Sequence, residues 1–206
     1  MRFLLFSTLV LLASCASSYK ALKPIPVDQA CVLKRMPVGL ATSWFDASVD
    51  VMENHISGLL LIKRMPDEAM RLVFTNEAGI TYFDFAFDPS GRFKVHYAIK
   101  QLNRKAVIRT LQTDFELLLG IPFRQGNLQA WRMGNEVFYG VQQKKKIAYF
   151  ITTPDCASLH RLEWASKRKR LVTAVVAGNS TSTPDSVQIQ HHTFNMHIRL
   201  TKLEKE

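Results

Sequence analysis

The sequence lacks any run of the roughly 20 apolar residues that a membrane-spanning helix needs, so it does not predict a polytopic membrane protein. Three cysteines in 206 residues are too few for a disulfide-rich scaffold. There is no Gly-Xaa-Ser-Xaa-Gly motif, no phosphate-binding glycine loop and no zinc motif. We therefore expect no enzyme, no bound metal and no cofactor.

Acidic residues are also scarce, since 17 Asp and Glu stand against 27 Lys and Arg and give a formal net charge of +10. This excess favours an anionic partner without saying which one. Aromatic residues are plentiful, with 13 Phe, 5 Tyr and 3 Trp. Such a composition excludes a disordered chain and indicates one globular domain with a sizeable core.

The first residues have the pattern of a secretory signal, because the positive Met1-Arg2 precedes the largely apolar residues 3–12. The segment Leu12-Ala13-Ser14-Cys15 resembles the bacterial lipobox, with two small residues before a cysteine. That resemblance implies cleavage before Cys15 and acylation of this residue. The alternative is an ordinary signal with a chance cysteine. Several acyl chains on one residue anchor a protein stably without a spanning helix.

We divide the chain into a lipoprotein signal peptide (1–14), a lipidated cysteine with a tether (15–40) and a single domain (41–206). In lipoproteins of this kind an Asp after the lipidated cysteine retains the protein in the inner membrane, and here that residue is Ala16. The resemblance therefore implies a lipid anchor in the outer membrane of a Gram-negative bacterium, on the periplasmic side.

Two cysteines remain, Cys31 and Cys156, in a compartment that permits disulfides. A bridge between them would tie the tether to the domain, and two free thiols are the alternative. The only histidine cluster is His191-His192 with His197, for which we expect a surface or edge position rather than metal binding.

From Trp44 onward the dominant hydrophobic period is two, which predicts β-strands separated by polar turns. Consecutive hairpins indicate an antiparallel sheet, and the need to hide its edges favours a barrel or half-barrel. Residues 59–62 and 147–151 are apolar on both faces, so each face needs a cover or lines an apolar cavity. We expect about ten strands, near 44–51, 55–63, 69–75, 79–87, 92–98, 136–142, 146–152, 158–165, 169–177 and a last, broken one at 186–201.

One segment, 104–119, has helical spacing, with Asn103 as a possible N-cap and Gly120 as a C-cap before Pro122. A single amphipathic helix between strands is placed to lie on the concave side of the sheet. The predicted fold class is mainly β with α, a curved antiparallel sheet forming an incomplete barrel that is plugged by a helix on its concave face.

Two basic runs, Lys144-Lys145-Lys146 and Lys167-Arg168-Lys169-Arg170, fall where we expect hairpin turns. They suit solvated loop tips, a contact with anionic lipid head groups, or a contact with an acidic protein. Nucleic acid is not an expected partner outside the cytoplasm.

Residues 70–85 resemble the LolB family of outer-membrane lipoprotein receptors, with a strand, a Thr-Asn turn ending in Gly79 and a second alternating strand. The likeness continues through the helix of residues 104–119, Gly120-Ile121-Pro122 and Gln129-Ala130-Trp131. It implies the LolA/LolB-like fold and a monomer that receives acylated lipoproteins from a periplasmic carrier and inserts them into the outer membrane. The implied partners are this carrier, the acylated cargo and outer-membrane lipid.

The resemblance implies that the turn between the two matched strands is an insertion loop whose protruding leucine helps to deliver cargo into the membrane, and Ala78 occupies the matching position here. Two alternatives stay open: a lipoprotein of the same fold that binds another lipid or a glycolipid, and a structural lipoprotein that docks onto an outer-membrane assembly. Ordinary core packing would explain the same residues that strand parity and helical spacing assign to an acyl-chain cavity, namely Phe74, Phe83, Phe85, Phe93, Val95, Leu111, Phe115 and Leu118.

Overall fold

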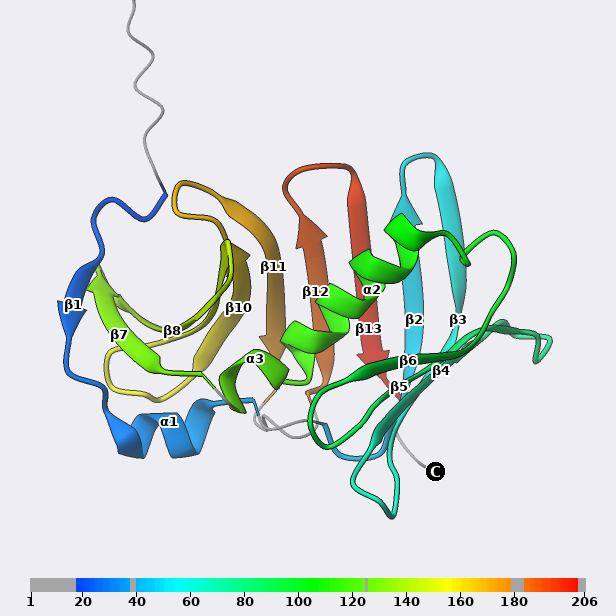
Figure 1. The fold of residues 1–206 in the computed structure, drawn as a ribbon, viewed down its shortest axis with the longest axis horizontal. Coiled ribbons are helices and arrows are strands. Elements are labelled where there is room, and N and C mark those ends of the chain that lie inside the picture. Colours follow the sequence, from blue (N-terminus) through cyan, green and yellow to red (C-terminus); the bar gives the residue numbers. More distant parts are fainter. Residues whose placement is uncertain (1–17, 38–39, 125, 179–183, 204–206) are drawn as a thin grey trace, which may run out of the picture.

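The computed structural model describes residues 18–37, 40–124, 126–178 and 184–203. Within these ranges the strands form one 13-stranded antiparallel sheet in the order β1-β7-β8-β9-β10-β11-β12-β13-β2-β3-β4-β5-β6 (Figure 1). The sheet is strongly curved and is not closed, since β1 and β6 are its two edges. This confirms the predicted fold class. None of the helices in the described ranges is long and apolar enough to span a bilayer.

The first part of the chain, up to the long helix, forms the elements β1 (Lys23–Ile25), α1 (Gln29–Arg35), β2 (Ser43–Val51), β3 (Asn54–Arg64), β4 (Met70–Thr75), β5 (Thr81–Phe87) and β6 (Phe93–Ala98). The remainder forms α2 (Lys105–Leu118), α3 (Ile121–Arg124), β7 (Leu128–Met133), β8 (Glu136–Gln143), β9 (Lys146–Thr152), β10 (Leu159–Ala165), β11 (Arg170–Ala177), β12 (Ser186–His191) and β13 (Met196–Lys202).

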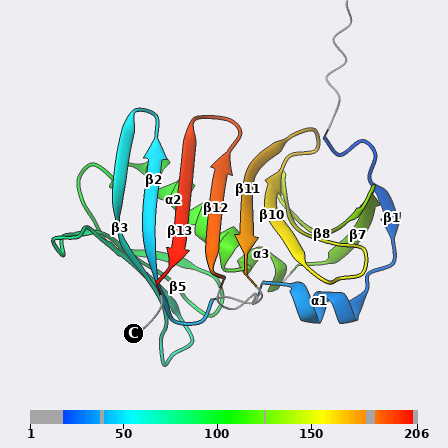
Figure 2. The ribbon, with the colours of Figure 1, turned by 180° about the vertical axis from the view of Figure 1, so that it is seen from behind.

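The long helix α2 crosses the concave face of the sheet diagonally, and both ends of the sheet curl toward it (Figures 1 and 2). Its apolar stripe is buried in the main core. Beyond its C-terminal end Gly120 has a φ of +68°, and a Cβ atom there would lie 1.8 Å from the carbonyl oxygen of Pro37. Only glycine fits this left-handed position and close approach, so the end of the helix is fixed against the N-terminal segment.

The opposite face of β7–β10 carries a second, smaller core. Tyr149 and Ile151 point into it from β9, whereas Ala148 and Phe150 point into the main core. The cover is supplied by the N-terminal segment, because the ring of Tyr19 stacks on Tyr149 at 5.5 Å. This explains why the sequence of β9 is apolar on both faces.

The segment expected to be an irregular tether folds against the domain from Ser18 onward. Its strand β1 pairs with β7, and α1 begins at Asp28, whose carboxylate accepts a hydrogen bond from the backbone N–H of Cys31 at 3.1 Å. Cys31 is joined to Cys156 by a disulfide with the Cα atoms 5.7 Å apart. From Ser18 onward, the described part of the predicted tether is therefore fixed to the domain.

Candidate functional site

The face beneath α2 is built from phenylalanine rings of the β4–β6 end of the sheet. Phe74 and Phe83 are cross-strand neighbours with ring centroids 5.5 Å apart, and Phe83 stacks on Phe85 at 4.3 Å. From α2, the ring of Phe115 meets Phe83 edge-on at 5.9 Å. Leu111 and Leu118 lie one turn to either side of Phe115 and are equally buried.

The other two predicted lining residues lie on the edge strand β6. Phe93 is half-buried and meets Phe85 at 5.1 Å. Val95 pairs with Phe85 across the strands but is 39% exposed, on the edge strand of the sheet. The eight residues are thus gathered on one face of the molecule, seven of them in contact with the apolar core and Val95 at its open edge.

Two polar contacts attach α2 to strands β10 and β12 of the sheet. The Nε1–H of Trp164 on β10 donates to the backbone carbonyl of Thr113 at 2.9 Å. His191 on β12 lies 2.9 Å from a carboxylate oxygen of Asp114, and both side chains are buried. The second oxygen, Oδ1 of Asp114, has no hydrogen-bond partner among the described residues.

Burial in this apolar setting raises the pKa of the Asp114 carboxyl above its usual range, and the hydrogen bond from His191 opposes that shift only in part. The surface or edge position expected for His191 is therefore wrong. His191 lies on the face of β12 that α2 covers, and Asp114 on α2 gives its imidazole a buried partner. The sequence held a signal for a buried polar group on α2, since Asp114 interrupts the apolar stripe next to Phe115, but none for its partner on β12.

The helix is attached unevenly along its length. Residues 105–110 of the helix include no buried side chain, whereas the buried residues begin at Leu111 and extend to Leu118. The side chain of Arg124 also donates to the carbonyl of Leu119 at 3.1 Å. Motion of α2 away from the sheet would therefore pivot about Gly120 and begin at the N-terminal end.

The turn between β4 and β5 exposes an apolar side chain that the sequence analysis did not single out. Asn76 closes this turn through its side-chain oxygen, which accepts the backbone N–H of Ile80 at 2.8 Å. Gly79 supplies the required positive φ of +81°. Ala78 is exposed at the tip, and the Ile80 side chain is 59% exposed. The turn thus exposes an aliphatic side chain two residues after Ala78.

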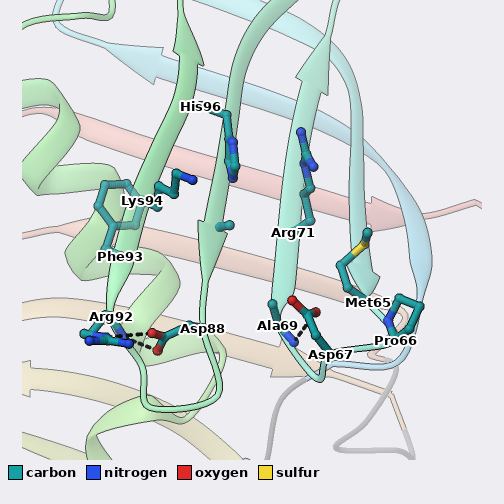
Figure 3. Close-up of a pocket in the computed structure, with 11 residues that line it drawn as sticks. Met65, Pro66, Asp67, Ala69, Arg71, Asp88, Arg92, Phe93, Lys94 and His96 are labelled. Atoms are coloured by element: carbon teal, nitrogen blue, oxygen red, sulfur yellow. Dashed lines mark hydrogen bonds and ion pairs between the residues drawn. The ribbon is translucent and has the colours of Figure 1, made fainter.

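A separate hollow of about 700 Å³ lies mainly on the outer face of β4–β6, away from α2 (Figure 3). Its walls carry charges of both signs, and two of its basic groups are already paired: Arg71 with Asp84 at 2.6 Å and Arg92 with Asp88 at 2.7 Å. This hollow is distinct from the apolar face beneath α2. Its lining consists of Met65, Pro66, Asp67, Ala69, Arg71, Ala86, Asp88, Arg92, Phe93, Lys94 and His96.

No protein-family model matches this sequence, and no curated protein matches it. Among solved structures, the chain is similar to a domain from Vibrio parahaemolyticus that is assigned provisionally to outer membrane lipoprotein sorting. The two share 8% sequence identity and a TM-score of 0.44, over 85% of this chain and 88% of that one. At this level of similarity we draw no conclusion about function from the match.

Proposed function

We propose that this protein is a lipoprotein anchored in the outer membrane through Cys15, that it receives acylated lipoproteins from a periplasmic carrier, and that it inserts them into the outer membrane. The observation that carries the proposal is the face beneath α2, where an amphipathic helix lies on a phenylalanine-rich, open-edged sheet. The lipobox at residues 12–15 and the LolB-like segment 70–85 support the same function.

An acyl chain would enter by taking the place of α2 on this face. The rings of Phe83 and Phe115 would then separate, and each would contact methylene groups instead of the other ring. Burial contributes about 0.8 kcal/mol per methylene, so ten methylenes supply roughly 8 kcal/mol toward the cost of moving the helix. This function needs no covalent chemistry.

Delivery would use the turn between β4 and β5. Ala78 offers little apolar surface, and the exposed side chain of Ile80 supplies the aliphatic group that enters the membrane. The position of Asn76 and Gly79 in this turn holds that side chain outward.

The test is transfer of an acylated lipoprotein from a loaded periplasmic carrier to the mature protein with Cys15→Ala, which keeps the acceptor free of its own acyl chains. We expect transfer to the parent chain and none to Phe115→Asp, because a carboxylate on the acyl-binding face must be desolvated when lipid binds. Lys105→Asp on the exposed first turn of α2 is the matched control, and it should accept cargo. Transfer to a folded Phe115→Asp protein would contradict the assigned face.

The close ring packing beneath α2 favours a second candidate, a structural lipoprotein that docks onto an outer-membrane assembly. Such a protein would keep α2 in place and would bind no acyl chain. Failure of transfer to the folded parent protein from an active carrier would favour this candidate.

A further inference from the structure

Four hairpin turns meet at one end of the sheet, and we call them together the hairpin rim. They are residues 144–145, 166–169, 192–195 and 52–53, which link β8–β9, β10–β11, β12–β13 and β2–β3. Ile147 pairs with Ala165, the N–H of His192 donates to Leu171 at 2.9 Å, and the N–H of Met52 donates to Asn195 at 3.0 Å. These contacts place the four turns side by side (Figures 1 and 2).

The hairpin rim is basic and carries apolar tips. The four turns and the adjoining Lys146 contain a single acidic residue, Glu53. Their apolar residues Met52 and Phe194 are 75% and 43% exposed. The two basic runs predicted at hairpin turns thus come together through the pairing of β9 with β10. Six basic side chains are exposed there: Lys144, Lys145, Lys146, Lys167, Arg168 and Lys169.

The opposite end of the sheet has a different charge balance. Its turn between β3 and β4 contains Asp67 and Glu68, and Glu68 pairs with Arg64 at 2.9 Å. The next turns along that end carry Asp155 and Asp185. Among these hairpin turns, the excess of positive charge therefore lies at the hairpin rim, and the two ends of the sheet are electrostatically distinct.

The N-terminal segment is fixed to the same end of the molecule. The backbone N–H of Ser18 donates to the carbonyl of Arg168 at 3.0 Å. The next residue, Tyr19, donates its hydroxyl to the buried carboxylate of Glu163 at 2.6 Å, and burial together with that carboxylate raises the pKa of the Tyr19 hydroxyl. Ser18 is three positions after Cys15, a span of roughly 11 Å at full extension.

We propose that the hairpin rim docks on the anionic phospholipid surface of the membrane that holds the acyl chains of Cys15, with Phe194 and Met52 at the boundary between head groups and acyl chains. This inference rests on the acylation of Cys15 in the proposed function, and it adds an orientation. Basic residues are attracted to anionic head groups. The short link from Ser18 to Cys15 holds the rim within reach of them.

The test uses the mature acylated protein in phosphatidylcholine vesicles with brominated acyl chains, with and without phosphatidylglycerol. The Phe194→Trp variant reports docking, because bromine quenches an indole that reaches the acyl boundary. Quenching beyond that of the parent protein, whose three native tryptophans set the background, is expected with phosphatidylglycerol and not without it.

Charge is then removed from the Phe194→Trp protein by Lys144→Gln, Lys145→Gln and Lys169→Gln. Each basic group near an anionic surface contributes about fivefold, so the docked-to-undocked ratio should fall about a hundredfold and the added quenching should disappear. Lys63→Gln, Lys94→Gln and Lys100→Gln remove the same charge elsewhere, from three exposed lysines, and should leave quenching intact. Circular dichroism checks that both proteins are folded.

Quenching that is equal with and without phosphatidylglycerol, or that survives the rim substitutions, would overturn the docking orientation. Intact mass separates this failure from that of the proposed function. An acylated protein that fails to dock overturns the orientation alone, and a protein without acyl mass overturns both. A protein that docks but accepts no cargo from a loaded carrier leaves the orientation standing.

Discussion

The hydrogen bond from Trp164 to the carbonyl of Thr113 gives a direct way to test whether α2 leaves the sheet when lipid binds. Trp164→Phe removes the N–H donor and keeps an aromatic ring beneath the helix. A neutral hydrogen bond of this kind contributes about 1 kcal/mol. Since α2 must break this bond to open, the closed form should lose about that much free energy relative to an open form.

A loss of about 1 kcal/mol corresponds to a roughly fivefold larger population of the open form. The apparent affinity of a protein whose binding-competent form is rare scales with that population. We therefore expect Trp164→Phe to bind an acylated peptide about fivefold more tightly, although it should be less stable than the parent in thermal unfolding. Fluorescence anisotropy of a labelled acylated peptide measures the affinity.

Tyr19→Phe is the matched control, because it removes the hydrogen bond from the Tyr19 hydroxyl to Glu163, on the face of the sheet away from α2. It should lower the free energy of unfolding and leave the affinity for the peptide unchanged. An affinity that is unchanged in Trp164→Phe, or raised equally in both variants, would refute the reasoning that α2 is displaced by lipid.

Three further predictions follow from the described contacts. Because burial raises the pKa of Asp114, its contribution favours folding below the usual carboxyl range near 4 and is lost as the pH rises through the folded-state value. Denaturant unfolding at a series of pH values should thus show Asp114→Asn gaining stability relative to the parent above about pH 4, and a constant difference would contradict this. The Cys31–Cys156 disulfide closes a loop of 125 residues, so replacing both cysteines by alanine should cost about 2–5 kcal/mol in the free energy of unfolding. In a transfer assay with acceptor vesicles, Ile80→Ser should bind acylated cargo normally and deliver it more slowly, whereas Ala78→Ser should deliver it at the parent rate. Equal delivery by the two variants would exclude Ile80 as the inserting group.

The strands and the long helix could be predicted from the sequence because their hydrophobic periods are clean. The alternation in residues 81–87 corresponds to β5, and the helical spacing over 104–119 corresponds to α2. The predicted break in the last strand falls at residues 192–195, between β12 and β13. In each of these segments local pattern and tertiary packing agree.

Elements that depend on distant partners were not predictable in the same way. β1 is three residues long and exists through its pairing with β7, more than 100 positions later. β7 has a weak alternation, since Ala130 is buried between Gln129 and Trp131 on a strand near the sheet edge. α1 lies among prolines that argue against regular structure, yet its N-cap Asp28 gives it a defined start.

The residues of the candidate face could be predicted from the sequence, but not whether that face is permanently closed or can open. Strand parity and helical spacing select Phe83, Phe85 and Phe115 correctly as one cluster. Neither pattern can tell a closed, packed face from one that opens, because both require the same apolar side chains. The polar attachment of Asp114 to His191 depends on a contact between α2 and β12, which a single sequence does not reveal.

The buried pair of Asp114 and His191 is costly if α2 is permanently core, and it suits a helix that moves. Two apolar side chains of similar size at these positions would pack without desolvating a carboxylate, and such replacements often stabilise a protein. The pair also leaves Oδ1 of Asp114 without a partner in the closed form among the described residues. If α2 swings out about Gly120 as the proposed function requires, that carboxylate regains water, which offsets part of the cost of breaking the contact. An arrangement that weakens the closed form in this way would thus lower the free energy needed to expose the proposed acyl-binding face.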